Sequence, residues 1–118
     1  MPTKWISCGA AFIDADVIRW KEAAWPRAKR KGGRAVKLGE RMITAEVLRD
    51  DNGWVRLLIR DYAVLSETRG RSVEMLAKGT EIRRKRETIE RGNPERRIWS
   101  DETARALVVS RFRGPEPL

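Results

Sequence analysis

The chain has 118 residues, of which 26 are lysine or arginine and 17 are aspartate or glutamate, so its formal net charge is +9. It contains a single cysteine, Cys8, so an internal disulfide and a cysteine-rich zinc site are excluded. It contains no histidine, so histidine-based catalysis is excluded as well. No apolar run comes near the roughly 20 residues of a membrane span, and the apolar start is too short for a secretory signal. We expect a single cytoplasmic domain over residues 1–118, without a cofactor or a metal.

The segment ADVIRWKEAAW, residues 15–25, predicts the first strand. Ile18 and Trp20 share one face, and the basic residues between and after them point to the other face. We assign Trp20 to the core. Asp14 and Asp16 would lie on one face of an extended chain as a possible metal or acid–base pair, but no further ligands accompany them.

A basic segment follows this strand. Residues 27–37 contain six basic side chains and no acidic one, namely Arg27, Lys29, Arg30, Lys31, Arg34 and Lys37. One interpretation is a loop that follows a phosphate backbone, in which Gly32 and Gly33 let the loop conform and offer backbone N–H groups. The alternative is a hairpin loop that is kept in water by its charge.

The clearest structural pattern is RMITAEVLRDDNGWVRLLIR, residues 41–60. Apolar and polar residues alternate on both sides of Asp-Asn-Gly, which predicts a β-hairpin. A three-residue loop, Asp51-Asn52-Gly53, would place Val47 opposite Leu57 and Ala45 opposite Ile59, so that one face is apolar. We therefore predict the three-residue loop rather than a two-residue one.

The next segments are less regular. RSVEMLA, residues 71–77, predicts a short strand. Residues 80–91 fit a helix capped by Thr80 and ended by Gly92, or a strand with Arg84 and Arg86 on the same face as Ile82. Two isoleucines make a thin helical stripe, so we predict a strand through about Thr88.

The C-terminal part predicts a helix from about Asp101 to Arg113. Ser100 would cap it, acidic residues occupy its first turn, and Gly114-Pro115 would end it. Its apolar residues recur at helical spacing on one face, Ala104, Leu107, Val108 and Phe112. We expect this face to dock on the β-structure of about residues 14–90, with a helical unit over 100–113 and a frayed tail over 114–118.

The predicted fold is mainly β with one C-terminal α-helix, either a small SH3-like barrel or a strongly bent antiparallel sheet of four to five strands. The order of these elements, with a long basic first loop and a tight central hairpin, resembles small SH3-like barrels of the KOW or Tudor type from about Asp16 to Thr88. KLGERMITAEVL is similar to the glycine-led strand of a KOW motif. The chain departs from Tudor readers because it lacks a cluster of cage aromatics.

The position of the charge points to a function. Residues 27–37 carry +6, residues 83–97 carry +4, and the rest of the chain carries −1. We expect the phosphate backbone of DNA or RNA to be contacted by the basic segment and by a second cluster, Arg83, Arg84, Lys85 and Arg86. Trp25 and Trp54 are candidates to stack on bases, whereas Trp99 is assigned to the core. Nineteen arginines suit phosphate recognition, although a GC-rich genome also favours arginine.

Two alternatives remain open. One is a protein-interaction module, with a protein partner or a homo-oligomer, suggested by Leu48, Leu58 and the terminal helix. The other is a toxin-like endoribonuclease that works without histidine. Its candidate residues are Tyr62, Glu46, Arg56 and Arg60, which no spacing motif connects.

Overall fold

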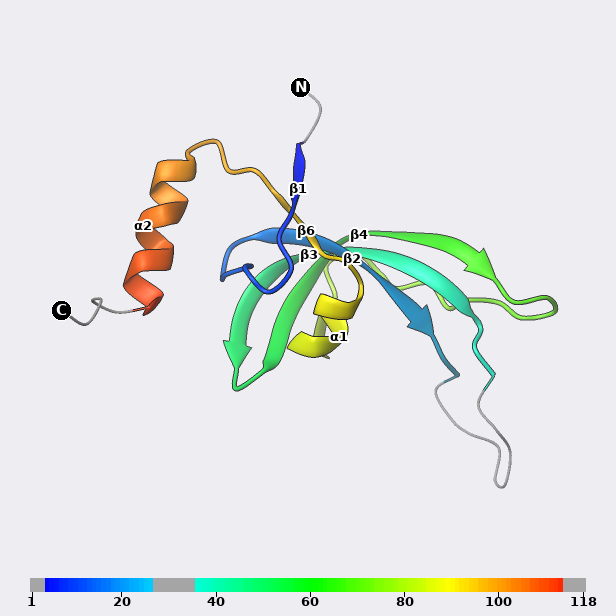
Figure 1. Cartoon of the computed structure of the whole chain (residues 1–118). Coiled ribbons are helices and arrows are strands. Elements are labelled where there is room, and N and C mark those ends of the chain that lie inside the picture. The colour runs from blue at the N-terminus through cyan, green and yellow to red at the C-terminus, as the bar shows by residue number, and fades with distance from the viewer. Residues whose placement is uncertain (1–3, 27–35, 114–118) are drawn as a thin grey trace.

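The computed structural model describes residues 4–26 and 36–113, with side chains through Val109. Six antiparallel strands form one sheet in the order β1-β6-β2-β3-β4-β5. The elements are β1 (Trp5–Ser7), β2 (Val17–Ala24), β3 (Gly39–Asp51), β4 (Trp54–Glu67), β5 (Glu81–Lys85), α1 (Arg86–Arg91), β6 (Glu95–Arg97) and α2 (Glu102–Arg113). Figure 1 shows a strongly curved sheet with α1 beneath it and α2 to one side.

The predicted mainly-β class with a C-terminal helix is confirmed, as an open, bent sheet rather than a closed barrel. The sheet has six strands instead of four or five. The two additional strands, β1 and β6, are three residues long and pair with each other. Strands of that length are too short to show the alternation by which the longer ones were recognised. Among the described residues, no helix is long and apolar enough to cross a membrane.

The core lies on the concave face of the sheet. As predicted, the alternating apolar residues of the three long strands are buried there, namely Ile18, Trp20, Ile43, Ala45, Val47, Val55, Leu57 and Ile59. Phe12 and Ile89 complete the cluster. Burying a large apolar side chain contributes roughly 1.5–3 kcal/mol, so this face is the main source of stability. Trp20 is almost fully buried, which confirms its assignment to the core.

The central hairpin has the predicted pairs but a shorter loop. Val47 pairs with Leu57 and Ala45 with Ile59, whereas Asp51 pairs with Trp54 and leaves only two residues in the loop. The three-residue loop is therefore wrong. A register shift between Val47 and Arg49 makes the predicted pairs compatible with the two-residue loop, because Leu48 is an extra residue on β3, a β-bulge. The bulge restores the apolar pairing that a two-residue loop alone would have lost.

The backbone of the hairpin loop has positive φ at both positions, 53° at Asn52 and 86° at Gly53, as in a type I′ turn. We expect Gly53→Val to destabilise the protein by about 1–3 kcal/mol, because a β-branched residue resists this conformation. Urea unfolding measures the loss. Asn52→Gly is the matched control and should be tolerated. A valine variant as stable as the wild type would show that the turn does not require glycine.

The segment after β4 differs from its prediction. Residues 71–77 do not form a strand, although Val73 is buried. The Val73 amide donates to the Glu67 carboxylate at 2.7 Å, and the Tyr62 hydroxyl donates to the Glu74 carbonyl at 2.8 Å. Hydrogen bonds to side chains of β4 thus hold this segment, instead of the backbone hydrogen bonds of a strand.

Residues 80–91 contain both alternatives, a strand to Lys85 and a helix from Arg86, so the strand prediction is wrong beyond Lys85. The change is set by tertiary contacts. Ile89 is fully buried in the core, and the Lys21 amide of β2 donates to the Gly92 carbonyl at 3.0 Å. A Cβ atom at Gly92 would lie 2.2 Å from the Lys21 carbonyl oxygen, so only glycine permits this approach. The helix α1 therefore closes the space between β5 and β2.

The terminal helix is attached by polar contacts. The carboxylate of Asp101, not Ser100, caps it by accepting from the amides of Thr103 and Ala104. Of the apolar face that was expected to dock, Leu107 is 60% exposed and Ala104 and Val108 are half-buried, so none of these described side chains is part of the core. The Phe112 side chain lies outside the described part of the chain.

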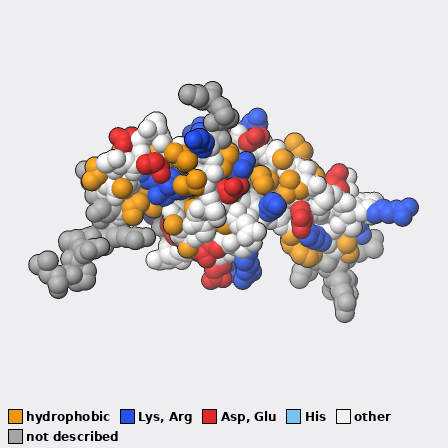
Figure 2. Space-filling view, turned by 45° about the horizontal axis from the view of Figure 1, so that its top comes forward, with side chains coloured by type: hydrophobic (Ala, Val, Ile, Leu, Met, Phe, Trp, Pro, Cys, Tyr) orange, Lys and Arg blue, Asp and Glu red, His pale blue; other side chains and the backbone are white. Residues whose placement is uncertain are grey.

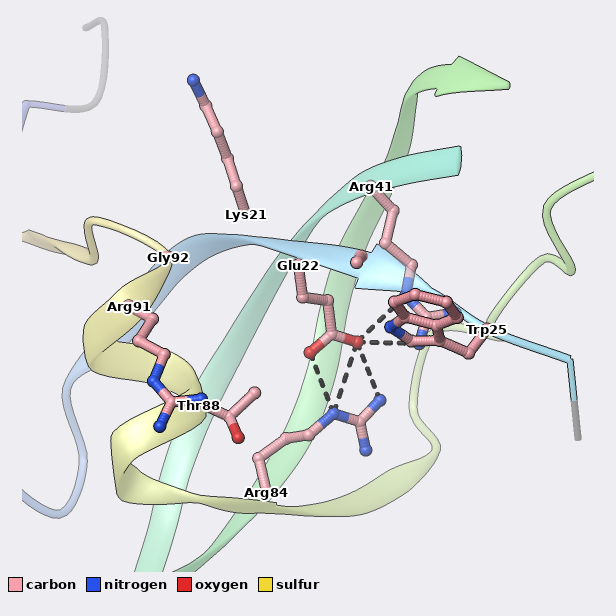
Figure 3. Close-up of a pocket in the computed structure, with 9 residues that line it drawn as sticks. Lys21, Glu22, Trp25, Arg41, Arg84, Thr88, Arg91 and Gly92 are labelled. Carbon is pink, nitrogen blue, oxygen red and sulfur yellow. Dashed lines mark hydrogen bonds and ion pairs between the residues drawn. The ribbon is translucent and has the colours of Figure 1, made fainter. Parts of the chain in front are cut away.

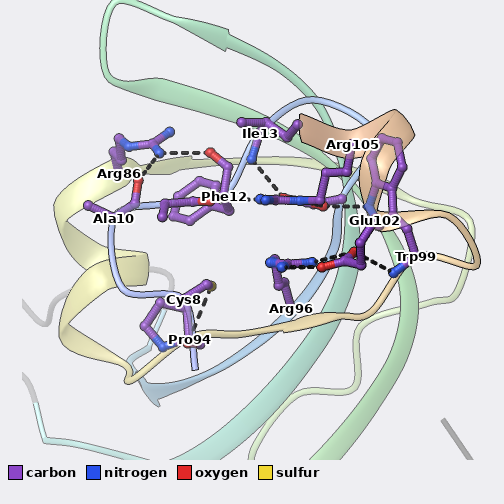
Figure 4. A network of polar contacts seen from close by, with 12 residues as sticks. Cys8, Ala10, Phe12, Ile13, Arg86, Pro94, Arg96, Trp99, Glu102 and Arg105 are labelled. Atoms are coloured by element: carbon purple, nitrogen blue, oxygen red, sulfur yellow. Dashed lines mark hydrogen bonds and ion pairs between the residues drawn. The ribbon is translucent and has the colours of Figure 1, made fainter. Parts of the chain in front are cut away.

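The polar attachment of α2 is centred on Asp16, whose side chain is fully buried. Its carboxylate accepts hydrogen bonds from the Ile13 amide, from Nε1 of Trp99 at 2.7 Å and from two guanidinium nitrogens of Arg105 at 2.7 and 3.0 Å. Figure 4 shows Ile13, Trp99 and Arg105 close together in this network. Trp99 is thus half-buried and hydrogen-bonded rather than part of the apolar core.

Beside it, Arg96 of β6 forms a bidentate pair with Glu102 of α2, at 2.7 and 3.1 Å. The Trp99 amide donates to the same carboxylate at 3.0 Å. These hydrogen bonds from Arg96 and Trp99 lower the pKa of Glu102 to about 2, so the pair stays charged at any neutral or mildly acidic pH. Two arginine–carboxylate pairs therefore connect the helix to the sheet.

Candidate nucleic-acid interface

The basic segment predicted to contact phosphate lies largely outside the described residues. This holds for Arg27, Lys29, Arg30, Lys31 and Arg34. Lys37 is described, and its ammonium group forms an ion pair with Glu40 at 2.8 Å. Its charge is therefore partly balanced within the protein.

The second basic cluster is divided between the two faces of β5. Arg83 and Lys85 point to the convex face, whereas Arg84 points to the concave face and binds Glu22. Arg86 serves the fold: it pairs with Asp50 at 2.9 Å, donates to the carbonyls of Ala10 and Phe12, and lies 3.8 Å from the centre of the Phe12 ring. Four adjacent cations thus have three different environments, because successive residues of a strand face opposite sides.

Trp54 lies on the convex face at the start of β4, next to the hairpin turn, and is 40% exposed. The strand register pairs Trp54 with Lys85 and Arg56 with Arg83. The guanidinium of Arg83 and the ammonium of Lys85 lie 5.0 and 5.5 Å from the Trp54 ring centre, within cation–π range. We call Trp54, Arg56, Arg83 and Lys85 the Trp54 platform.

The charges of the platform are only partly balanced. Arg56 lies 3.5 Å from a carboxylate oxygen of Asp51 and 3.8 Å from one of Glu81. No carboxylate of the described residues forms an ion pair with Arg83 or Lys85. On the face shown in Figure 2, acidic and basic side chains are interleaved rather than gathered by sign. The platform differs from that pattern, because its indole has two cations near it that form no ion pair with the described residues.

A second feature is a hollow of about 610 Å³ on the concave side, between β2, β5 and α1. Its floor is Glu22, whose side chain is 6% exposed. The carboxylate accepts from Nε and Nη2 of Arg41 at 3.0 and 2.7 Å, and from the same atoms of Arg84, both at 3.0 Å. Figure 3 shows this arrangement, which we call the Glu22 clamp.

The electrostatics of the clamp favour the ionised carboxylate. Burial alone would raise the pKa of Glu22, but the hydrogen bond and charge of Arg84, the Trp20 indole N–H and the charge of Arg41 together bring it below the ordinary value of 4.5. One carboxylate thus holds two guanidinium groups in place and neutralises one of them. The basic side chain of Arg91 also lines the hollow, whereas the Lys21 side chain points away from it (Figure 3).

Trp25 forms part of the wall of this hollow and is 55% exposed. It directly follows Ala24, the last residue of β2, and in the sequence it precedes Pro26 and the basic segment. Both tryptophans predicted to stack on bases are therefore accessible, one on each face of the sheet. Trp5, in contrast, is covered by Arg19, whose guanidinium lies 4.4 Å from its ring centre.

The structure brings two of the four residues considered for RNA cleavage into contact. Glu46 and Arg60 pair with each other, Arg56 belongs to the platform, and the Tyr62 hydroxyl donates to the Glu74 carbonyl. Cys8 is not an activated nucleophile, because burial, and then the negative charge of Asp16, raise its pKa to about 11.

The possible acidic metal pair is also not formed. Asp14 lies in a turn, and Asp16 is occupied by Arg105 and Trp99. Within residues 4–26 and 36–109, no group of three or more possible ligands is placed to hold a metal ion.

Sequence reasoning missed the Glu22 clamp. Glu22 is an acidic residue on the same strand face as Trp20, and that short-range pattern is the only signal the sequence offers. Its partners Arg41 and Arg84 are 19 and 62 residues away in the chain. Only the curvature of the sheet brings β2 and β5 close enough for this contact.

Comparison of the chain with protein-family models, with curated proteins and with solved structures found no match.

Proposed function

We propose that this protein binds nucleic acid, with arginine and lysine side chains contacting the phosphate backbone. The observation that carries the proposal is the Trp54 platform, in which the cations of Arg83 and Lys85 lie 5.0 and 5.5 Å from the centre of an exposed indole on one face of the sheet. Phosphate contacts provide most of the affinity of such proteins, and exposed aromatic rings add stacking with bases. The basic segment, residues 27–37, adds six cations to the same chain.

The proposal agrees with the chemistry of the exposed cations. Arginine and lysine that lack a carboxylate partner lose little on binding phosphate, because no existing ion pair has to be broken. Contacts to the backbone carry no sequence information, so we expect binding with modest sequence selectivity. We also propose the resemblance to KOW-type barrels, which is based on the order of elements.

The platform can be tested by removing its two unpaired cations. We expect Arg83→Ala/Lys85→Ala to flatten the slope of log K against log salt by about 1.4 on a single strand and about 1.8 on duplex DNA, roughly 0.7 and 0.9 per lost phosphate contact. Fluorescence anisotropy with labelled oligonucleotides at several salt concentrations measures the slope.

The control for this variant is Lys4→Ala/Lys78→Ala, which removes the same charge from two exposed positions away from the platform. Its slope should stay close to that of the wild type. Equal effects of the two double variants would show that only net charge matters and that the platform is not a contact site.

A protein-interaction module is the second candidate. It is favoured by α2, which the described contacts attach through polar groups while Leu107 stays exposed on its surface. Salt separates the two candidates, because phosphate binding weakens steeply as salt is added and the burial of apolar surface does not.

A further inference from the structure

The packing of the fold does not explain a hollow of this size beside Trp25. The core cluster ends at Trp20 and Ile43, and the concave face continues beyond it into the Glu22 clamp. A volume of about 610 Å³ is in the range of pockets that hold small organic ligands. Trp25 in its wall is 55% exposed, so this ring is accessible to a ligand.

The charge of the hollow selects an anionic ligand. Arg41, Arg84 and Arg91 line it together with a single carboxylate, Glu22. Three cations against one anion leave two positive charges. The clamp fixes Arg41 and Arg84 before any ligand arrives, which reduces the entropy lost on binding. Among the described residues, Arg91 forms one long contact, of 3.9 Å with Glu87, and its side chain is 81% exposed, so it can turn toward a phosphate.

The walls of the hollow offer a flat apolar surface opposite polar groups. Figure 3 shows the Trp25 indole at one side, near the clamp, and Thr88 and Arg91 of α1 at the other. An exposed indole is a stacking surface for any nucleobase. In a duplex the bases are stacked on one another inside the helix, so only an unpaired base can reach a ring in a concave site.

We infer that the hollow binds one unpaired nucleotide of a single strand, RNA or DNA, with its base stacked on Trp25 and its phosphate near Arg91. This rests on the proposed function and makes it more specific, because it gives the protein a preference for single strands.

The test uses the full chain and labelled 12-nucleotide probes, oligo(dT), oligo(U) and a duplex of equal length, at one salt concentration near 0.1 M. We expect both single strands to bind at least tenfold more tightly than the duplex. Trp25→Leu should weaken single-strand binding roughly 5- to 150-fold, the range produced by the loss of one base–aromatic stack. Trp25→Phe should restore most of the affinity, because phenylalanine keeps a ring face and leucine keeps only apolar bulk.

Three outcomes separate the inference from the proposed function. Duplex affinity that is unchanged in Trp25→Leu, together with a large single-strand loss, supports the inference. Equal affinity for duplex and single strands, or a leucine variant that binds single strands like the wild type, overturns it while nucleic-acid binding stands. If no probe binds at all, the proposed function fails with it. Circular dichroism of the leucine variant should match the wild type, because Trp25 is mostly exposed.

Discussion

Replacing Asp16 with alanine should destabilise the protein by about 3–5 kcal/mol. The Asp16 carboxylate is fully buried and accepts four hydrogen bonds, two of them from Arg105. Removing one member of a buried ion pair leaves the other charge uncompensated, which costs far more than an exposed pair would. Urea unfolding followed by circular dichroism gives the change in free energy.

The same substitution should also release the terminal helix, because Arg105 and Trp99 both depend on Asp16 for their position. Hydrogen exchange of the α2 amides is expected to become faster in Asp16→Ala under conditions where the sheet is still protected. Asp101→Ala is the matched control: it removes the exposed helix cap and should cost only about 1 kcal/mol. An Asp16 variant that is no less stable than this control would contradict the buried network.

Glu22→Gln should cost about 3 kcal/mol, because glutamine keeps the shape of the side chain but removes the charge that holds Arg41 and Arg84. The pH dependence gives an independent measurement. Since the folded protein holds the pKa of Glu22 below 4.5, the pair stabilises the fold fully above that pH. The contribution is lost as the pH falls through the lower, folded-state pKa.

The difference in unfolding free energy between the wild type and Glu22→Gln should therefore shrink steadily below pH 4.5. Glu40→Gln provides the comparison, since Glu40 forms an exposed pair with Lys37 and its removal should leave the stability nearly unchanged. A stability difference for Glu22→Gln that is the same at pH 3 and pH 7 would show that the charge of Glu22 is not what holds the clamp.

Much of the sheet was predictable because its long strands bury one face. The pairs Val47–Leu57 and Ala45–Ile59 followed from matching apolar faces across the hairpin. The loop length did not, since the bulge at Leu48 compensates for a two-residue turn and no local pattern marks it. The change from strand to helix at Arg86 depends on Ile89 packing into a core built by distant strands, which local propensity cannot show.

The candidate site was predictable only in part. The exposure of Trp25 and Trp54 agrees with the prediction, and strand alternation places Arg84 on the inner face with Ile82. The Glu22 clamp was not predictable as a whole: Arg41 is the direct cross-strand partner of Glu22 on β3, but Arg84 comes from β5, which reaches Glu22 only when the sheet curves. Contacts over such sequence distances depend on the whole fold rather than on any motif.

The central claim is that this protein binds nucleic acid through phosphate contacts, and the most direct measurement is the salt dependence of binding by the wild-type chain. With about five phosphates neutralised, log K against log salt should have a slope near −3.5 on a single strand and near −4.5 on duplex DNA. A steep slope of this size, with single strands preferred, is the expected result. No binding to RNA, single-stranded DNA or duplex DNA at low salt would contradict the claim, and the interaction-module alternative would then take its place.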